Sequence, residues 1–420
     1  MNNLKDLIKN QNIIYVTVNP ERALGLEKIL HQFYIVSLSD SYIFEFLDKN
    51  RFYSLQRQMP NINIRENSKE LLLQKSVSEY IKNIDNPSFM FFKITKGVEE
   101  ILKNKKILNT KSILNKKFEN KLNLVENFKD MIPQSLTFIP KDTTYSNLKE
   151  KFGNQFVIQF IIGHSGENTY FIKNKDEFDE IKNKYPKRFS KAVKFIEGNT
   201  YTINGVITRN GIIVFNLSKQ ITGIETLTKH KGGTVGNDWL TKLPIHIKLD
   251  LLEKMTIIGK KLQKSGYKGL FGADFISDNN KTYLIEINPR ENASIPTFTK
   301  IQIKNGQIPS KLIHILEFLN IEYSIDIEKI NKEIFDDADL RQIIIRNTTD
   351  NTITIKKDLN GVYNTDLEKI KDDYDISNID KRQFLIISAK GAVNKNMEIA
   401  RVQTKENIDT FIIDNIKRML

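Results

Sequence analysis

The chain has 420 residues, of which 40% are hydrophobic and 27% charged, as in a globular protein of about two to four domains. It has no cysteine and no apolar run of membrane-spanning length, so we exclude disulfides, thiolate metal sites, a cysteine nucleophile and a membrane span, and expect a cytoplasmic protein. The formal net charge is +13, but no compact basic block with interleaved aromatics occurs, so we interpret it as a composition bias and expect no nucleic-acid binding.

The first part of the chain predicts a small, mostly parallel α/β sheet. Continuous apolar runs typical of buried strands occupy Ile13–Val18, Phe33–Leu38 and Pro87–Lys93. Helical spacing alternates with them over Glu21–His31 and Lys96–Lys103. Such alternation is typical of parallel sheets. No glycine-rich dinucleotide motif follows the first strand, which argues against a dinucleotide cofactor.

The next stretch is mostly helical over residues 112–130 and contains Lys116, Lys117 and Lys121. A short strand is expected between Pro133 and Pro140. The segment Phe156–Ile172 then has the pattern of a strand, a loop with two glycines and a second strand. Backbone N–H groups of such loops can bind phosphates, although a plain hairpin turn has the same pattern.

Two further segments precede the most informative part of the sequence. Ala192–Ile207 has a strand pattern that is interrupted at Gly198. Ser218–Trp239 contains four glycines and little periodicity, so we expect an irregular segment there. Long irregular segments inside a compact domain are often functional.

A pair of strand-like runs, Gly272–Ile276 and Thr282–Ile287, carries a polar set that predicts a magnesium site. Asp274 lies on the first run, and Glu286, Asn288 and Arg290 alternate along the second and just past it. Alternate residues of a strand share one face, so a hairpin would bring these groups together. Carboxylate and amide oxygens suit Mg²⁺, and a guanidinium suits a transferring phosphoryl group.

The remaining segments are structural. Leu251–Ser265 is amphipathic and should pack behind the hairpin, whereas the residues directly after Arg290 predict a loop. A helix is expected at Pro309–Leu319. Residues 331–420 read as β-rich with a last helix, and we expect no functional site in them. The predicted elements are Leu340–Arg346, Thr352–Ile355, Phe384–Ala389, Glu398–Thr404 and the helix Ile408–Met419.

The run from Asp274 to Arg290 resembles the metal-binding end of ATP-grasp enzymes, in which an acid on one strand is followed twelve residues later by E-x-N-x-R. The resemblance covers roughly residues 110–300. It implies an α/β chain with an α+β catalytic domain, in a three-part architecture. The parts are an N-terminal pre-ATP-grasp domain (1–111), an ATP-grasp domain (112–330, with a small subdomain at 112–197 and a large one at 198–330) and a β-rich C-terminal domain (331–420).

The resemblance implies a nucleotide site. Its phosphates would contact Lys117, with Lys116 as the alternative, and Gln159 stands where the family usually has a lysine. The phosphate loop would include Gly163, Ser165 and Gly166. Adenine would contact the main chain of Lys194 and Ile196 and be covered by Phe195. Thr200 or Glu197 would reach the ribose, and Gln220 the nucleotide or substrate.

The resemblance also implies the catalytic groups. Asp274, Glu286 and Asn288 would hold two Mg²⁺ ions, with Mn²⁺ as an alternative metal. Arg290 would steady an acyl-phosphate. One of the groups beside Gly232 and Gly233, for which we prefer Lys231, would neutralise phosphate charge.

The implied activity is an ATP-dependent ligase that activates a carboxylate as an acyl-phosphate and joins it to an amine, releasing ADP and phosphate. The substrates would be small molecules, and the chain could act as a homodimer. Two alternatives stay open. One is a bicarbonate-activating carboxylase, although no biotin-attachment segment is evident. The other is a non-catalytic nucleotide-binding module, which Gln159 alone favours.

Overall fold

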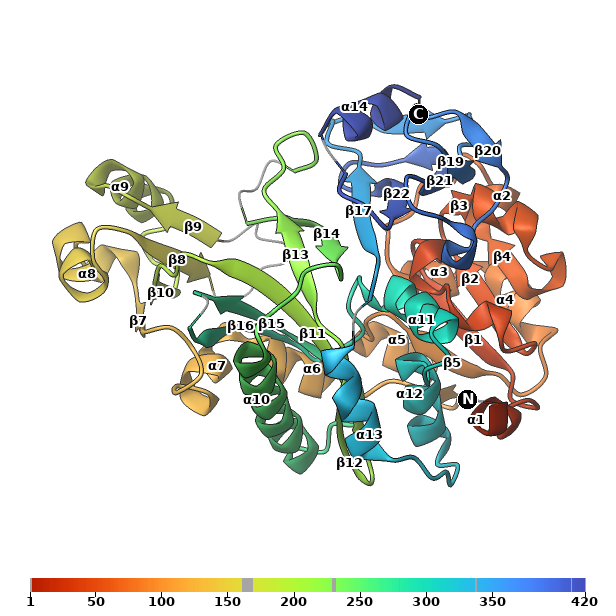
Figure 1. Cartoon of the computed structure of the whole chain (residues 1–420), viewed down its shortest axis with the longest axis horizontal. Coiled ribbons are helices and arrows are strands. Elements are labelled where there is room, and N and C mark those ends of the chain that lie inside the picture. The colour runs from red at the N-terminus through yellow and green to blue at the C-terminus, as the bar shows by residue number, and fades with distance from the viewer. Residues whose placement is uncertain are drawn as a thin grey trace.

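The structure is a computed structural model that describes residues 2–160, 169–228, 232–278, 280–336, 338–408 and 410–419. Its strands form a five-stranded, a four-stranded and a 13-stranded sheet. Figure 1 shows the four-stranded sheet at one end of the molecule, the five-stranded sheet at the other and the long sheet between them. This mixed α/β architecture confirms the predicted fold class. None of the helices in these ranges has the length and apolarity needed to span a membrane.

The N-terminal sheet is parallel, with strand order β4-β2-β1-β5-β6. Ile13 and Tyr15 face one hydrophobic cluster and Ile14 and Val16 another, which explains the continuous apolar run of this strand. The strands are β1 Ile13–Thr17, β2 Phe33–Ser37, β4 Phe52–Ser54, β5 Ser88–Phe91 and β6 Lys106–Ile107. The helices are α1 Asn2–Asp6, α2 Leu55–Gln58, α3 Ser68–Leu72, α4 Lys75–Lys82 and α5 Lys96–Ile101.

The helix predicted over Glu21–His31 is wrong. Two short 3₁₀ turns, η1 Pro20–Arg22 and η2 Leu26–Lys28, occupy this segment instead. Gly25 separates them with a φ of +116°, which an α-helix cannot accommodate. A Cβ at Gly25 would also lie 2.6 Å from Thr299 Cγ2, so the loop packs more closely than a side chain would allow.

The four-stranded sheet is antiparallel, with strand order β7-β10-β8-β9. One face packs on helices α8 and α9 through a cluster that includes Phe156, Ile158 and Phe178. The opposite face carries the side chains that alternate with these. The elements are β7 Ser135–Phe138, α8 Tyr145–Phe152, β8 Phe156–Phe160, β9 Thr169–Ile172, α9 Lys175–Lys184 and β10 Ser190–Lys194.

The long sheet begins with β16-β15-β11-β13-β14. Helix α10 (Ile245–Lys264) covers one face through Leu251, Met255 and Ile258, as its amphipathic pattern predicted. The strands are β11 Asn199–Thr208, β12 Gly211–Val214, β13 Ser218–Thr222, β14 Thr234–Asp238, β15 Gly269–Ser277 and β16 Thr282–Asn288. The other helices are α6 Ser112–Glu119, α7 Lys121–Asn127, α11 Ile295–Lys304, α12 Ser310–Leu319 and α13 Ile327–Lys332.

The same sheet continues into the C-terminal part, because β14 pairs with β17 and β17 with β22. A Cβ at Gly236 would lie 2.2 Å from the Gln342 carbonyl oxygen, so glycine permits this close approach. We propose that the boundaries at residues 111 and 330 separate parts of different function. The boundary at 330 does not separate independently packed units, because β14 pairs with β17 across it. The elements are β17 Arg341–Arg346, β18 Ile353–Ile355, β19 Gly361–Tyr363, β20 Lys369–Lys371, β21 Phe384–Val393, β22 Glu398–Thr404 and α14 Thr410–Met419.

Two further predictions need correction. The segment Ser218–Trp239 is not wholly irregular, because β13 and β14 pair antiparallel at its two ends. The segment after Arg290 is not simply a loop either, since α11 starts at Ile295 with Pro296 in its first turn. Proline suits that position because its missing N–H has no partner there in any helix.

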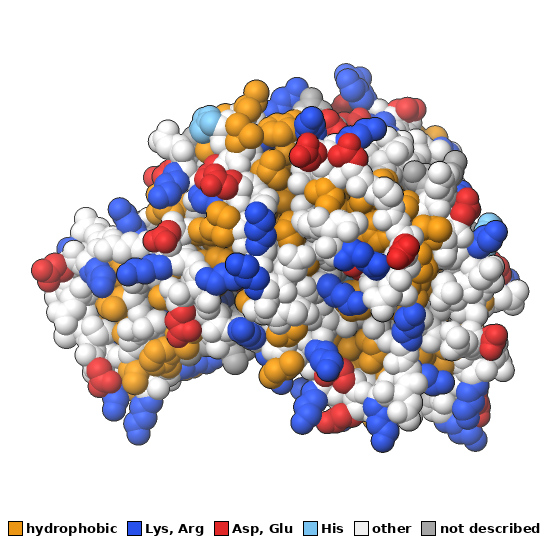
Figure 2. All heavy atoms as spheres, turned by 90° about the horizontal axis from the view of Figure 1, so that it is seen from below, with side chains coloured by type: hydrophobic (Ala, Val, Ile, Leu, Met, Phe, Trp, Pro, Cys, Tyr) orange, Lys and Arg blue, Asp and Glu red, His pale blue; other side chains and the backbone are white. Residues whose placement is uncertain are grey.

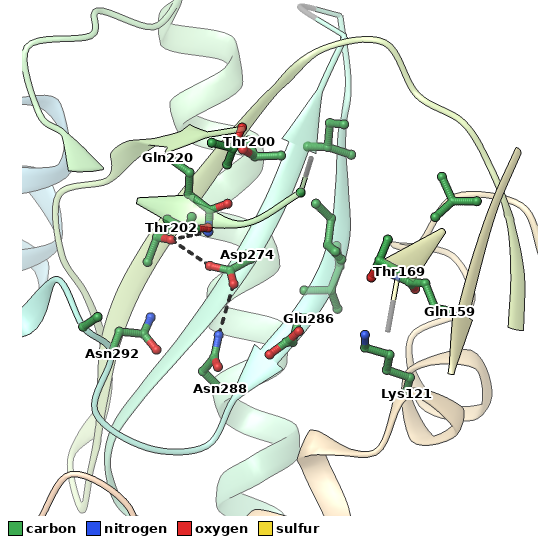
Figure 3. A pocket seen from close by; sticks show the side chains of 18 of the residues that line it. Lys121, Gln159, Thr169, Thr200, Thr202, Gln220, Asp274, Glu286, Asn288 and Asn292 are labelled. Carbon is green, nitrogen blue, oxygen red and sulfur yellow. Dashed lines mark hydrogen bonds between the residues drawn. The ribbon is translucent and has the colours of Figure 1, made fainter. Parts of the chain in front are cut away.

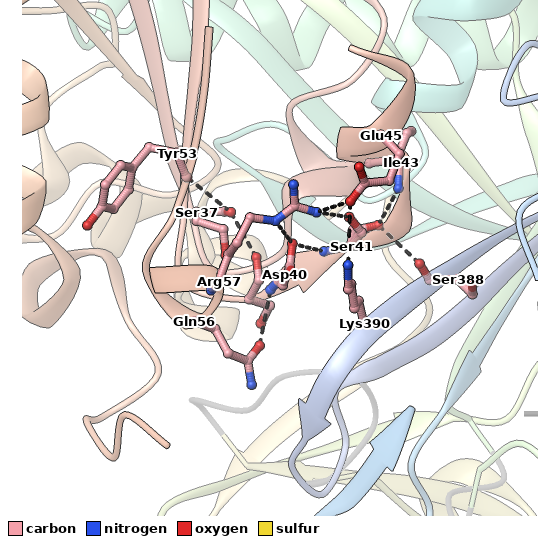
Figure 4. A network of polar contacts seen from close by, with 12 residues as sticks. Ser37, Asp40, Ser41, Ile43, Glu45, Tyr53, Gln56, Arg57, Ser388 and Lys390 are labelled. Carbon is pink, nitrogen blue, oxygen red and sulfur yellow. Dashed lines mark hydrogen bonds and ion pairs between the residues drawn. The ribbon is translucent and has the colours of Figure 1, made fainter. Parts of the chain in front are cut away.

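A polar network joins the N-terminal and C-terminal parts (Figure 4). The short strand β3 (Asp40–Ser41) pairs with β21, and Ser41 Oγ donates to the Ser388 carbonyl oxygen at 3.1 Å. Arg57 donates to Asp40 at 2.9 Å and to Glu45 at 3.0 Å. Lys390 Nζ lies 3.4 Å from Glu45 Oε1, so this network joins β21 to the N-terminal part.

The outer surface does not gather its charge in one place. In the view of Figure 2, lysine and arginine side chains are scattered and interspersed with acidic ones. This distribution agrees with the interpretation of the net charge as a composition bias.

A buried ion pair fixes the segment after β16 to the N-terminal sheet. Lys311 Nζ lies 2.9 Å from Glu291 Oε1, and their side chains are 0% and 2% exposed. Tyr15 OH donates to Glu291 Oε2 at 2.8 Å. Lys311 also donates to the carbonyl oxygens of Arg22 and Leu24, so one ammonium holds the loop after β1.

We expect Lys311→Met to lower the free energy of unfolding in urea by about 3–5 kcal/mol, because Glu291 would be left buried and unpaired. The double variant Lys311→Met/Glu291→Met should be more stable than the single one. Lys75→Met, at a lysine that is 91% exposed, is the control and should change little. Equal stability of the single and double variants would contradict this account.

We expect stability to fall as the pH drops from 6.5 towards 4, in part because of His314. Its Nδ1 accepts from Leu270 N at 2.9 Å, and its Nε2 lies 2.7 Å from the Leu108 carbonyl oxygen, so the neutral ring fits. Burial, with Lys268 and Lys311 nearby, lowers the pKa of His314 from 6.5 to about 4. The unfolded chain therefore binds the proton first, which costs the native state about 3 kcal/mol over this range. Unfolding at several pH values should show a smaller loss in His314→Gln.

Candidate active site

A cavity of about 710 Å³ lies between the four-stranded and the long sheet. One wall comes from β8, β9 and β10, and the facing wall from β11, β13, β15 and β16. Residues of the N-terminal part and of β17 also line the cavity. Figure 3 shows both walls with Lys121 between them. The cavity is therefore built by all parts of the chain.

A row of three polar side chains crosses the long sheet at the centre of the cavity. Thr202 on β11 lies opposite Asp274 on β15, which lies opposite Glu286 on β16. Thr202 Oγ1 donates to Asp274 Oδ1 at 2.7 Å and accepts from Gln220 Nε2 at 2.7 Å. An irregularity beside Ile285 shifts the register, so that Glu286 faces Asp274.

Asn288 completes this row. It lies opposite Gly272, and its Nδ2 donates to Asp274 Oδ2 at 3.2 Å (Figure 3). The neighbouring Asn292 reaches the same area because Gly272 has no side chain. A Cβ at Gly272 would lie 2.2 Å from Asn292 Nδ2. Glycine at this position is therefore required by close packing of the site.

The electrostatics of the row favour a bound cation. Burial and then the negative charge of Glu286 together raise the pKa of Asp274 to about 7, against the hydrogen bonds that lower it. The two carboxylates repel each other, and a cation would relieve this. In the described ranges no group of three or more His, Cys, Asp or Glu converges, so a metal here would use two carboxylates with the Asn288 amide oxygen. That oxygen-only set fits Mg²⁺.

The facing wall is formed by the open side of the four-stranded sheet. Gln159 on β8 lies between Thr169 on β9 and Lys191 on β10, and all three line the cavity. Lys121, in the first turn of α7, is 6% exposed and also lines it. Burial lowers the pKa of Lys121, whereas Glu286 raises it.

The two lysines that the sequence favoured for phosphate binding lie outside the cavity. Lys116 and Lys117 are exposed on α6 and do not line the cavity. The helix starts at Ser112, and its buried side carries Asn115 and Phe118, which turns the two lysines outward. A short break at Asn120 separates α6 from α7, and Lys121 instead points inward.

The predicted hinge lies at the edge of the cavity. Lys194, Phe195, Ile196, Glu197 and Thr200 all line it. The Lys194 N–H already donates to the Gln134 carbonyl oxygen at 2.9 Å, so only the carbonyl of Lys194 could serve adenine. A Cβ at Gly198 in this hinge would lie 1.9 Å from the carbonyl oxygen of Ser277, which explains why a glycine interrupts the strand pattern at this position.

Three arginines lie at one end of the cavity, which we call the arginine-rich end. Arg22, Arg290 and Arg346 line it together with Phe92. The guanidinium carbons of Arg22 and Arg290 lie 4.1 and 5.0 Å from the centre of the Phe92 ring. Arg290 Nε donates to Glu119 at 3.3 Å, and Lys93 donates to the same carboxylate at 2.7 Å. This end suits an anionic substrate group.

Sequence reasoning did not identify Arg22, Lys191 or Arg346 as site residues. It also expected no functional site in the C-terminal part, to which Arg346 belongs. A charged residue inside an apolar strand, as in Lys191, was a usable signal. Arg22 and Arg346 gave none, because they come together only through folding. Gln220 lines the cavity as expected, whereas Gly163, Ser165, Gly166 and Lys231 lie outside the described residues.

Comparison with known proteins agrees with this geometry. Residues 118–294 match the ATP-grasp domain family. The chain is 26% identical over 145 residues to the carbamoyl phosphate synthase large chain of Clostridium acetobutylicum, which covers 33% of this chain and 13% of that protein. It is 28% identical over 423 residues to an uncharacterized protein of Methanocaldococcus jannaschii, covering 98% of this chain and 90% of that protein.

Two solved structures share the fold. N5-carboxyaminoimidazole synthetase of Staphylococcus aureus, complexed with ADP, has a TM-score of 0.55 at 13% identity and covers 97% of this chain and 96% of that one. The biotin carboxylase domain of Hydrogenobacter thermophilus 2-oxoglutarate carboxylase, with MgADP and bicarbonate, has a TM-score of 0.56 at 12% identity, covering 97% and 89%. With the domain match over residues 118–294 and a cavity lined largely by those residues, this part of the chain is an ATP-grasp domain.

Proposed function

We propose that this chain is an ATP- and Mg²⁺-dependent ligase that activates a carboxylate as an acyl-phosphate and joins it to an amine, releasing ADP and phosphate. The observation that carries the proposal is the row of Thr202, Asp274 and Glu286 with Asn288, which faces a cavity inside an ATP-grasp domain. Half-buried carboxylates that face each other repel, which is costly unless a ligand uses them.

Asp274, Glu286 and Asn288 would hold two Mg²⁺ ions, or Mn²⁺ in their place. Each oxygen of Asp274 accepts one hydrogen bond and keeps a second lone pair for a cation. When bound, the metal would offset negative charge on the phosphates. Thr202 and Gln220 orient the Asp274 carboxylate through their chain of hydrogen bonds.

The nucleotide would lie between the two sheets. We propose Lys121 as a phosphate-binding lysine in place of Lys117, because Lys121 lines the cavity beside Gln159. The main chain of Ile196 and the Lys194 carbonyl would bind adenine, with Phe195 as apolar cover. Phe195 packs edge-on against Phe171 with ring centres 6.3 Å apart, which gives that side of the cavity an apolar surface.

The acid would bind at the arginine-rich end. Its carboxylate oxygen attacks the γ-phosphorus of ATP while the bond to ADP breaks. Arg290 stabilises the charge of the transferring group. The amine nitrogen then attacks the carbonyl carbon, and phosphate leaves. Arg22 and Arg346 would bind a negative group of either substrate.

Glu286→Gln should reduce phosphate release from Mg-ATP by at least about a hundredfold while leaving the thermal unfolding temperature close to that of the wild type. The reason is that the amide keeps the shape of the side chain and removes one of the two charges that hold the metal. The measurement is a phosphate-release screen over pooled amino acids and small acids. Glu253→Gln, at an exposed carboxylate on α10, is the matched control.

The same screen separates the candidate activities. Release that depends on both an acid and an amine supports the ligase. Release with bicarbonate alone would replace it with a carboxylase-type activity. Nucleotide binding without release in any pool would favour a non-catalytic module, and full activity of Glu286→Gln would overturn the site assignment.

Arg346→Met should raise the KM for the anionic substrate by roughly ten- to a hundredfold and change the KM for ATP by less than about threefold. The reason is that Arg346 lines the cavity near Arg22, and no hydrogen bond or ion pair among the described residues joins it to Asp274, Glu286 or Asn288. Lys381→Met, at an exposed residue before β21, is the control. A change in the KM for ATP alone would contradict the placement of the acid at this end.

A further inference from the structure

Lys191 is a buried lysine that the fold alone does not explain. It is the second residue of β10 and is 2% exposed. Its neighbours are Ser190, which pairs with Phe160, and the core residue Ala192. It belongs to the largest fully buried side chains of the described residues. Lysine is almost never fully buried unless it is paired.

The strand register directs Lys191 into the cavity. It lies opposite Gln159 on β8 and opposite Thr137 on β7. Directly opposed residues share a face of the sheet, and Gln159 and Lys191 both line the cavity. The next residue, Ala192, packs in the core on the other face with Ile158. A one-residue change of register would exchange these two environments.

No described residue pairs with the Lys191 ammonium. No hydrogen bond or ion pair within the described ranges uses it, and its charged neighbours are Lys121, which repels it, and Glu286, which attracts it. Burial and then the charge of Lys121 together lower the pKa of Lys191 to about 8. The wall that carries Lys121 and Lys191 thus holds two ammonium groups, and the carboxylate that acts on both of them, Glu286, lies on the facing wall.

We propose that Lys191 is a phosphate-binding residue of the nucleotide site, and that it supplies from β10 the positive charge that Gln159 on the adjacent strand does not provide. This inference rests on the proposed nucleotide site. The ligand class is a polyphosphate, because an excess of buried ammonium groups suits several phosphate oxygens better than a single carboxylate. Lys191 and Lys121 then bind the phosphates from one wall, and the Asp274–Glu286 row faces them from the other.

A structural role for Lys191 leads to a different expectation. A lysine that stabilised the fold would pair with a carboxylate or with carbonyl oxygens, as Lys311 does. Replacing such a lysine would destabilise the chain. Replacing an unpaired buried ammonium with an apolar group of similar length should leave the ligand-free chain equally stable or more stable.

The test measures binding of ATP, ADP and adenosine to the wild type and to Lys191→Met by calorimetry, with Mg²⁺ present. We expect the variant to bind ATP and ADP roughly ten- to a hundredfold more weakly and adenosine within about threefold of the wild type. Its unfolding temperature without ligand should be unchanged or higher. Lys151→Met, at an exposed lysine of α8, is the control and should bind all three ligands normally.

A second variant tests the position of the charge. Gln159→Lys/Lys191→Gln exchanges the two opposed side chains and moves the ammonium to β8. We expect it to recover at least about half of the lost binding free energy, because opposed Cβ atoms lie about 5 Å apart. Lys191→Gln alone should bind ATP as weakly as Lys191→Met.

The outcomes distinguish this inference from the proposed function. If the wild type binds no nucleotide, the proposed function fails. If the wild type binds ATP and Lys191→Met binds it equally well, only the role of Lys191 fails. Weaker binding of adenosine to the same extent as ATP, or a lower unfolding temperature, would assign Lys191 to the fold instead.

Discussion

The register of three antiparallel strands is the constraint on which the site depends. Thr202, Asp274 and Glu286 face each other only because β11, β15 and β16 pair in one alignment. A shift by one residue would turn all three into the core under α10, where unpaired charge is too costly. The apolar residues that alternate with them, such as Tyr201 and Ala273, fill that core. Packing on one face of the sheet therefore fixes the chemistry on the other.

The arrangement of the arginine-rich end of the cavity depends on a second, buried interaction. Lys311 binds Glu291 and the carbonyl oxygen of Arg22, so the residues beside Arg290 and the loop that carries Arg22 are held by one ammonium. Arg346 reaches the same end from β17, which the pairing with β14 places there. The N-terminal and C-terminal parts thus shape the site where we propose that the acid binds, whereas the nucleotide would lie between the walls of the ATP-grasp domain.

We propose that Lys121 and Lys191 allow the phosphate end of the site to work without a lysine at Gln159. Lys121 and Lys191 come from a helix start and a neighbouring strand, yet both line the cavity beside Gln159. On this proposal the site needs a positive charge near Gln159, and a lysine at any of several neighbouring positions can supply it. A departure from a family pattern at a single position therefore says little about function until its spatial neighbours are known.

The sequence by itself determined the hairpin of β15 and β16 and the convergence of Asp274, Glu286 and Asn288 on it, because both follow from alternation within one hairpin. It also determined the amphipathic helix α10 from its helical spacing. It misjudged Glu21–His31, where Gly25 and close packing against Thr299 override helical spacing. It also favoured Lys117, with Lys116 as the alternative, whereas both lysines are exposed on α6 and the break at Asn120 turns Lys121 towards the cavity. Only the tertiary structure brought Arg22, Lys191 and Arg346 to the cavity. Their positions depend on pairing between strands far apart in the chain, and that pairing is decided by which faces can be buried together.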